Sequence, residues 1–223
     1  MRVILWKLGI EWAHLKRALW PRFARKVYYF AFGANLCREV LEQRRIRVYD
    51  AFDYVLRDSD LRFSQPGFYR RHGYASADSA AGGRVYGRMY LLLETDALRM
   101  DYFEGVPFLD AHEKVFCESE GLRFFYYRTT RIVDGLKPTR EYLDYILEAY
   151  RAMPGVPGHY LQSLQATEVL EELQPIDRTG LFVRHSERWP RRLDGLLVRY
   201  ERLCLKAVEL VWHRSPLQLL IRY

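Results

Sequence analysis

Glu104 is the residue of this sequence best suited to proton transfer. It ends the helix predicted for "TDALRMDYFEG", residues 95–105, where the helix dipole is negative and disfavours a further negative charge. Asp101, three residues earlier, would repel it. Its apolar neighbours would desolvate it, namely Phe103, Val106, Pro107 and Phe108. These effects predict a raised pKa, as a general acid and base requires; the alternative is a surface glutamate paired with an arginine.

The segment "YYFAFGANLC", residues 28–37, is the second candidate for chemistry. An aromatic strand leads into Gly33, Ala34 and Asn35, and a helix is predicted to follow. Such a turn leaves backbone N–H groups pointing outward, and these groups can bind an anion. An ordinary corner between a strand and a helix is the alternative interpretation.

The cysteines and histidines give weaker patterns. Cys37, Cys117 and Cys204 lie far apart, which favours a reducing compartment and a cytoplasmic location. None of the six histidines pairs with another at metal-ligand spacing, so we expect no metal. Cys117 follows His112 by five residues, which in a strand places them on opposite faces and disfavours a catalytic Cys–His pair.

The elements that must position these residues are mostly strands. Hydrophobic alternation predicts strands over 27–32, 47–57, 61–64, from Gly73, 84–94, 112–118 and 122–130. Helices are predicted over 34–45, with Asn35 capping the first turn, over 95–105 and 138–151, and up to about Leu173. Because a regular alternation of strand and helix is missing, we predict an α+β fold: a small mixed or antiparallel β-barrel with surrounding helices.

The charge of the chain divides it into three parts. Residues 1–26 hold seven Lys or Arg and one acid, a net charge of +6; residues 184–223 hold nine and four, a net charge of +5. The total of +7 leaves −4 for residues 27–183. We therefore predict a mildly acidic domain between two basic extensions. Such a domain is a poor candidate for binding nucleic acid, since phosphate contacts need a positive surface.

The first extension has apolar residues at roughly helical spacing: Trp6, Leu8, Trp12, Leu15 and Leu19. This pattern is typical of a helix docked on the core or of one lying on an anionic membrane. No stretch has the roughly 18 apolar residues of a membrane span. We expect a peripheral membrane or protein contact through the basic ends, and a homodimer is considered alongside the monomer.

Four motifs, in order over residues 27–180, resemble those of the γ-glutamylcyclotransferase-like proteins. "YYFAFGANL" resembles their Tyr-Phe-Ala-Tyr-Gly-Ser-Asn-Leu signature, and "GYASADSAAGGRVYGRMYLL" their Gly-x-Ala stretch with its glycine-rich turn. "LRMDYFEGV" resembles their Leu-x-x-Asp-x-x-Glu-Gly-Val helix end. "PTREYLDYILEAYRAMPGVPGHYLQSL" with "IDRTG" looks like the late helices of γ-glutamylcyclotransferase proper.

The resemblance implies roles for individual residues. Glu104 matches the catalytic carboxylate, and the loop whose amides hold the substrate's α-carboxylate matches Gly33, Ala34, Asn35 and Leu36. Tyr127, or else Tyr126, and Tyr142 match tyrosines of the family's binding pocket. The chain departs from the family at three places. Phe32 replaces a tyrosine and Ala34 a serine, while Ala111 and His112 occupy the region of another tyrosine.

The activity that the resemblance implies is cyclisation of a γ-glutamyl peptide or amine to 5-oxoproline, with release of an amino acid or amine. Such a reaction is classed as a transferase or lyase reaction and is connected with glutathione metabolism. The substrate's own α-amine attacks the γ-carbonyl, so one carboxylate that accepts and returns protons suffices, and no cofactor is expected. The alternative is a non-catalytic ligand-binding or scaffold protein on the same fold, recruited to a membrane or partner by its basic ends.

Overall fold

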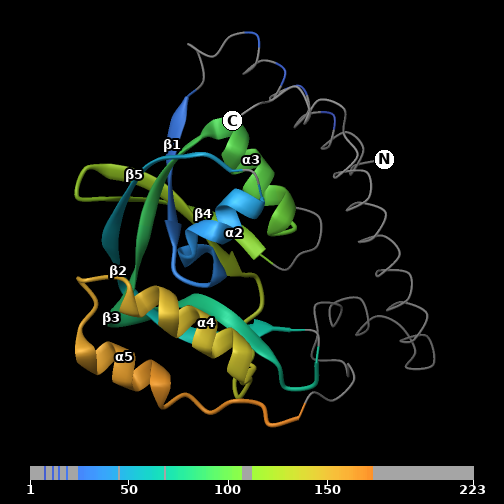
Figure 1. Ribbon diagram of the computed structural model, residues 1–223, viewed down its shortest axis with the longest axis vertical. Coiled ribbons are helices and arrows are strands. Elements are labelled where there is room, and N and C mark those ends of the chain that lie inside the picture. Colours follow the sequence, from blue (N-terminus) through green and yellow to red (C-terminus); the bar gives the residue numbers. More distant parts are fainter. Residues whose placement is uncertain are drawn as a thin grey trace, which may run out of the picture.

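The computed structural model describes residues 25–44, 46–67, 69–106 and 112–172, together with Leu8, Trp12, Leu15 and Leu19 (Figure 1). Most of the basic extension 1–26 and all of 184–223 therefore lie outside the described residues, as do Pro107, Phe108 and Ala111. The α+β class predicted from the sequence is confirmed.

One mixed sheet of five strands forms the centre of the fold, in the order β2-β3-β1-β5-β4. Its strands are β1 (Lys26–Ala31), β2 (Val48–Pro66), β3 (Gly73–Leu93), β4 (His112–Ser119) and β5 (Leu122–Thr129). The pair β1–β5 is parallel, and the other neighbouring pairs are antiparallel. The β2–β3 hairpin is curved, and the first part of β3 comes close to β5: Thr129 N of β5 donates to Ser76 Oγ of β3 (3.4 Å). The sheet therefore curls towards a barrel.

Alternation along β1 and β5 divides the core between the two faces of the sheet. Tyr29 and Tyr127 pack on the face covered by α2 (Arg38–Gln43) and α3 (Glu94–Phe103). Phe30 and Tyr126 point to the opposite face, into the concave side of the hairpin. The sheet is thus apolar on both faces, and this explains the near-continuous aromatic runs in both strands.

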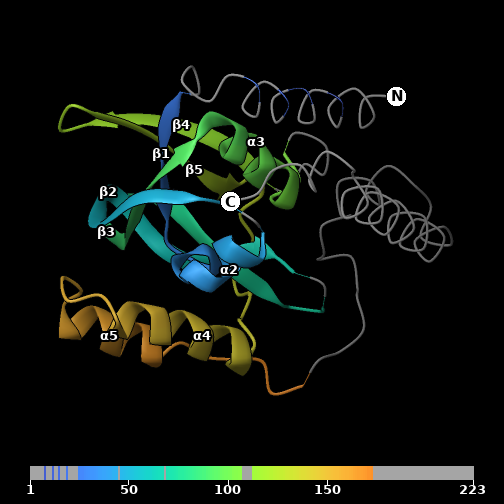
Figure 2. The same ribbon diagram turned by 45° about the horizontal axis from the view of Figure 1, so that its top comes forward.

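Helices α4 (Arg140–Arg151) and α5 (Gly158–Gln165) lie side by side, on the far side of the molecule from α3 (Figures 1 and 2). Buried Leu143, Ile146 and Tyr150 of α4 pack with Leu36 of the turn after β1. This third cluster joins the late helices to the segment that the sequence identified as an anion-binding turn.

The sequence broke each long strand of the hairpin in two, and that prediction was wrong. Residues 47–57 and 61–64 belong to one strand, β2, and the stretches from Gly73 and over 84–94 belong to β3. The polar break is a bulge: the register shifts between Arg57 and Ser59, and Asp58 has a φ of 54°. Asp58 Oδ1 accepts from Gly82 N (2.9 Å) across the hairpin, so these turn-forming residues bend the ribbon without ending it.

Two helix predictions also need correction. The helix expected over 34–45 is a 3-10 turn, η2 (Ala34–Leu36), followed by α2, because Cys37 between them is extended. Asn35 caps neither piece, since its side chain bonds to other groups described below. The last helix ends at Gln165 and not near Leu173. Leu170 N, in the stretch predicted to be helical, donates instead to Pro138 O of another segment (2.9 Å).

Among the helices of the described residues, none combines the length and the apolar character that crossing a membrane requires.

Candidate active site

Glu104 directly follows the last residue of α3, and the helix end fixes its position. Gly105 has a φ of 71°, a conformation that glycine adopts without strain, and Val106 N donates back to Asp101 O (2.8 Å). This helix termination turns the chain away from α3. The Glu104 side chain is 12% exposed and points to the turn after β1.

The turn after β1 is held by buried tyrosines from distant elements. Tyr150 of α4 donates to Phe32 O (2.8 Å), and Tyr90 of β3 donates to Leu36 O (2.7 Å). Inside the turn, Leu36 N donates to Gly33 O (2.9 Å). Over the described ranges, no acceptor contacts the amides of Ala34 and Asn35. These two amides are therefore candidate donors to an anionic ligand.

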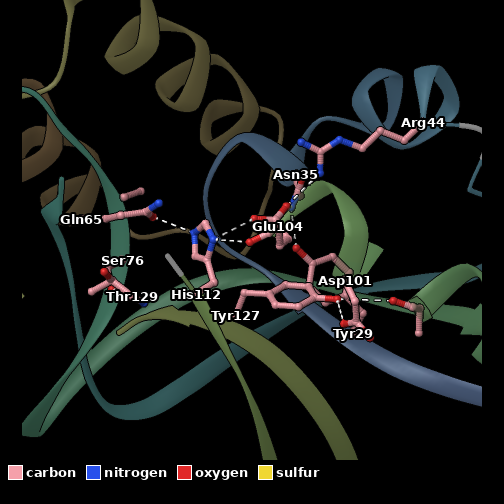
Figure 3. Close-up of polar contacts among 12 residues, drawn as sticks. Tyr29, Asn35, Arg44, Gln65, Ser76, Asp101, Glu104, His112, Tyr127 and Thr129 are labelled. Atoms are coloured by element: carbon pink, nitrogen blue, oxygen red, sulfur yellow. Dashed lines mark hydrogen bonds and ion pairs between the residues drawn. The ribbon is translucent and has the colours of Figure 1, made fainter. Parts of the chain in front are cut away.

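Asn35 connects this turn to the carboxylate (Figure 3). Its Nδ2 donates to Glu104 Oε1 (3.0 Å) and to the hydroxyl of Tyr29 (2.7 Å). Its Oδ1 accepts from Arg44 Nη1 (3.0 Å), which also donates to Glu104 Oε1 (2.8 Å). Arg44, the residue directly after α2, packs its guanidinium on the ring of Phe103, 4.9 Å from the centroid. The carboxylate is therefore fixed through one oxygen, Oε1.

The raised pKa predicted for Glu104 is wrong. Burial by itself would raise the pKa of this carboxyl, but His112, Arg44 and the hydrogen bond from Asn35 together lower it below its ordinary value of 4.5. Asp101, which the sequence predicted to repel it, is not among the causes of the shift, and its own carboxylate pairs with Lys114. The alternative considered above was half correct: Glu104 does pair with an arginine, yet it is not a surface residue.

His112, the first residue of β4, lies on the other side of Glu104. Its Nδ1 lies 2.8 Å from the backbone oxygen of Glu104 and 3.7 Å from Oε2, and its Nε2 lies 2.8 Å from Gln65 Oε1 on β2. The imidazole is 16% exposed. In Figure 3 it lies between Gln65 and Glu104, so three elements meet at this ring.

A second charged cluster lies beside the first and contains Tyr127. The Tyr127 hydroxyl donates to Asp101 Oδ1 (2.6 Å), and Lys114 Nζ lies 3.0 Å from the same oxygen. Burial and the charge of Asp101 raise the pKa of Tyr127 well above its ordinary value. Tyr127 is thus on the face of the sheet that carries α3, but its hydroxyl is directed to Asp101.

The other residues predicted from the family resemblance surround the turn. Tyr142 places its hydroxyl beside Gly33, where it accepts from Ala75 N (3.3 Å). Phe32 and Leu36 are buried, and each supplies a backbone oxygen that anchors the turn. The structure thus brings Glu104 together with the turn 33–36, and places Tyr142 at its start.

Sequence reasoning missed Tyr29, Arg44, Gln65 and the role of His112. Arg44 and Gln65 lie 60 and 39 positions before Glu104, so no local spacing could indicate them. The one available signal was His112, which stands in the region where the family carries a tyrosine. Within the described parts of the chain, no group of three or more His, Cys, Asp or Glu residues could hold a metal ion.

The arrangement can receive a proton on one carboxylate oxygen while the other is held. The hydrogen bonds from Asn35 and Arg44 to the carboxylate both end on Oε1, and none from the residues that the structure describes ends on Oε2. The neighbouring turn offers the amide of Asn35, whose side chain bonds to Glu104, and the amide of Ala34, the residue before it. A ligand with a carboxylate and an ammonium group separated by one carbon suits these two features.

Comparison with known proteins identifies the fold. No protein-family model matches the sequence, and no curated protein sequence does either. A solved structure named γ-glutamyl cyclotransferase aligns with a TM-score of 0.55 and 19% identity, covering 73% of this chain and 99% of that one. An uncharacterized human protein aligns with a TM-score of 0.54 and 21% identity, over 68% of this chain and 94% of its own.

YkqA from Bacillus subtilis aligns with a TM-score of 0.55 and 16% identity, over 68% of this chain and 57% of that one. The fold of this chain is therefore that of the γ-glutamyl cyclotransferase-like proteins, as the sequence motifs predicted. At these identities the likeness concerns the fold, and the function is argued from the site itself.

Proposed function

We propose that this protein is a γ-glutamylcyclotransferase, which converts the γ-glutamyl group of a peptide or amine to 5-oxoproline. The observation that carries the proposal is the contact between Glu104 and Asn35, because it joins a poorly exposed carboxylate to a turn with two available amides. The shared fold supports it.

The reaction uses each part of this geometry. The amides of Ala34 and Asn35 bind the α-carboxylate, which places the α-ammonium beside Glu104. The ionised carboxylate takes a proton through Oε2, and the freed amine attacks the γ-carbonyl within the same molecule. The lowered pKa of Glu104 keeps it ionised before the substrate arrives. The bond to the leaving nitrogen then breaks as that nitrogen gains a proton.

A ligand-binding protein without catalysis is the second candidate, and one observation favours it. Arg44 pairs with Glu104 at 2.8 Å and lowers its basicity, as suits a carboxylate that recognises an ammonium group without accepting its proton. The two functions differ in one product, 5-oxoproline.

The test is 5-oxoproline formation from a panel of γ-glutamyl dipeptides, γ-glutamyl amines and glutathione, with Glu104→Gln measured in parallel. We expect wild-type turnover and a loss of at least about a hundredfold in the variant, since a positioned acid–base group contributes about that much. Glu141→Gln, at an exposed position of α4, is the matched control and should retain full activity. Substrate binding without turnover across the panel would establish the second candidate.

A further inference from the structure

The proton balance of the proposed reaction makes a demand on the site beyond one carboxylate, and this inference rests on the proposed function. Ring closure removes two protons from the α-nitrogen, because an ammonium becomes a lactam N–H. The leaving nitrogen gains one proton as its bond to the γ-carbon breaks and a second when it becomes an ammonium. A carboxylate that takes a proton from the α-nitrogen and gives one to the leaving nitrogen must therefore return to the same position and the same ionised state in every turnover.

The contacts of His112 match this demand. Its Nδ1 faces the backbone oxygen of Glu104 (2.8 Å), which can only accept, so Nδ1 carries a proton. Its Nε2 faces Gln65 Oε1 (2.8 Å), also an acceptor. A ring with acceptors at both nitrogens satisfies them only as an imidazolium, whose positive charge then lies 3.7 Å from Glu104 Oε2.

We propose that His112, as an imidazolium oriented by Gln65, is a positioning residue for the cyclisation: it holds the main chain of Glu104 and places positive charge beside Oε2. It acts through Glu104 and not on the substrate, since both of its nitrogens are engaged. Its charge favours the ionised form of the carboxylate, so Glu104 more readily gives up a proton that it has accepted. The pKa of Glu104 is lowered by His112 in the same sense.

The charged and titratable groups around the ring belong to four elements. Arg44, which follows α2, bonds to Glu104 and is coupled to the ring through that carboxylate. The ring centroid of Tyr127 of β5 lies 6.5 Å from the ring centroid of His112. Asp101 of α3 and Lys114 of β4 pair with each other. Gln65 of β2 carries no charge. Glu104 is therefore the group with which the charge of His112 is directly coupled.

The test compares the pH dependence of kcat/KM for wild type, His112→Gln and Gln65→Leu. We expect kcat/KM to fall by about tenfold to a hundredfold in His112→Gln, since small losses of alignment have effects of that size. We also expect its acidic limb to move to higher pH, because the pKa of Glu104 rises without the positive charge. Gln65→Leu should move the limb in the same direction by a smaller amount. His159→Gln, at an exposed position of α5, is the control and should leave the profile unchanged.

A uniform loss of activity with both limbs in place would assign His112 a purely structural role and overturn the inference. Nuclear magnetic resonance of the His112 ring supplies a readout that does not need turnover. We expect two slowly exchanging ring N–H signals in the wild type, one of which is lost in Gln65→Leu; a single signal in the wild type would contradict the inference. An inactive wild type with two signals would refute the proposed function and leave the charge state of His112 standing.

Discussion

Glu104 lies between Arg44 and His112, and these neighbours determine which proton transfers it performs well. A carboxylate whose pKa is lowered is a weaker base, and its protonated form is a stronger acid. Arg44 and His112 favour the ionised form, and burial favours the neutral form. The protonated form of Glu104 is consequently more acidic than an ordinary glutamic acid side chain, which suits it to protonating a leaving amine.

Arg44 is the group through which this balance can be tested. In Arg44→Met the guanidinium is lost while an apolar side chain of similar length remains against Phe103. The pKa of Glu104 should then rise, since one cause of its lowering is removed, and the acidic limb of kcat/KM should move to higher pH. Carboxyl carbon shifts of Glu104, followed by nuclear magnetic resonance, measure the same change directly. Arg38→Met, at an exposed position of α2, should leave both unchanged.

An unchanged limb in Arg44→Met would mean that the ion pair does not govern the ionisation of Glu104. A limb that moved to lower pH would contradict the electrostatic account altogether, since no loss of a positive neighbour lowers the pKa of a carboxyl.

The residues of the site were predictable from sequence to different degrees. Glu104 and Asn35, which the structure brings into contact, were both singled out because each stands in a contiguous motif at the end of a helix or strand. The pKa of Glu104 was misjudged, because its local neighbours predict desolvation and repulsion, whereas Arg44 and His112 reach it only in the folded chain. Arg44, 60 residues before Glu104, cannot be read from spacing, and together with His112 it outweighs the local effects.

The turn after β1 owes its shape to elements that come much later in the chain. Tyr150 is fully buried, and its hydroxyl lies 2.8 Å from both Phe32 O and Tyr86 O. One side chain therefore ties α4 to the end of β1 and to β3. The position of the two available amides thus depends on the docking of α4.

Removing this hydroxyl tests that dependence. In Tyr150→Phe, the single hydroxyl proton that Phe32 O and Tyr86 O share is lost, and we expect unfolding to become easier by about 1–3 kcal/mol. Denaturant unfolding followed by circular dichroism measures the change. Tyr49→Phe, at a position 39% exposed, is the control and should alter stability by less than about 0.5 kcal/mol. Equal stability of both variants would show that α4 docks through its apolar side chains alone.

The elements were predicted well where one periodicity dominates and poorly where turn-forming residues occur inside a strand. β1, β4 and β5 were predicted to within about two residues from their aromatic and branched side chains. The hairpin was divided because Asp58 and Gly82 are typical of loops. Their bond across the two strands, which converts two apparent loops into one bend, is a tertiary contact that no local pattern contains.

On the scale of the whole chain, charge and exposed apolar side chains point to the first extension as a contact surface. Leu8, Trp12 and Leu19 are helical and between 55% and 58% exposed, and their spacing in the sequence is typical of residues on one side of a helix. Residues 1–26 carry a net charge of +6. Apolar side chains beside clustered Lys and Arg are typical of helices that bind anionic membranes, so contact with such a surface stays our prediction.

Co-sedimentation with vesicles tests this prediction on the full chain. We expect binding to vesicles that contain anionic phosphatidylserine, weaker binding as salt rises because exposed charges are screened, and little binding to neutral vesicles. Replacing Leu8, Trp12 and Leu19 together by Gln should abolish it. Phe116→Gln is the control, since Phe116 is 62% exposed on β4, far from this extension in sequence, and should bind as wild type. Binding that survives the triple replacement would place the contact outside these three residues. Binding that does not depend on lipid charge would exclude an electrostatic contact.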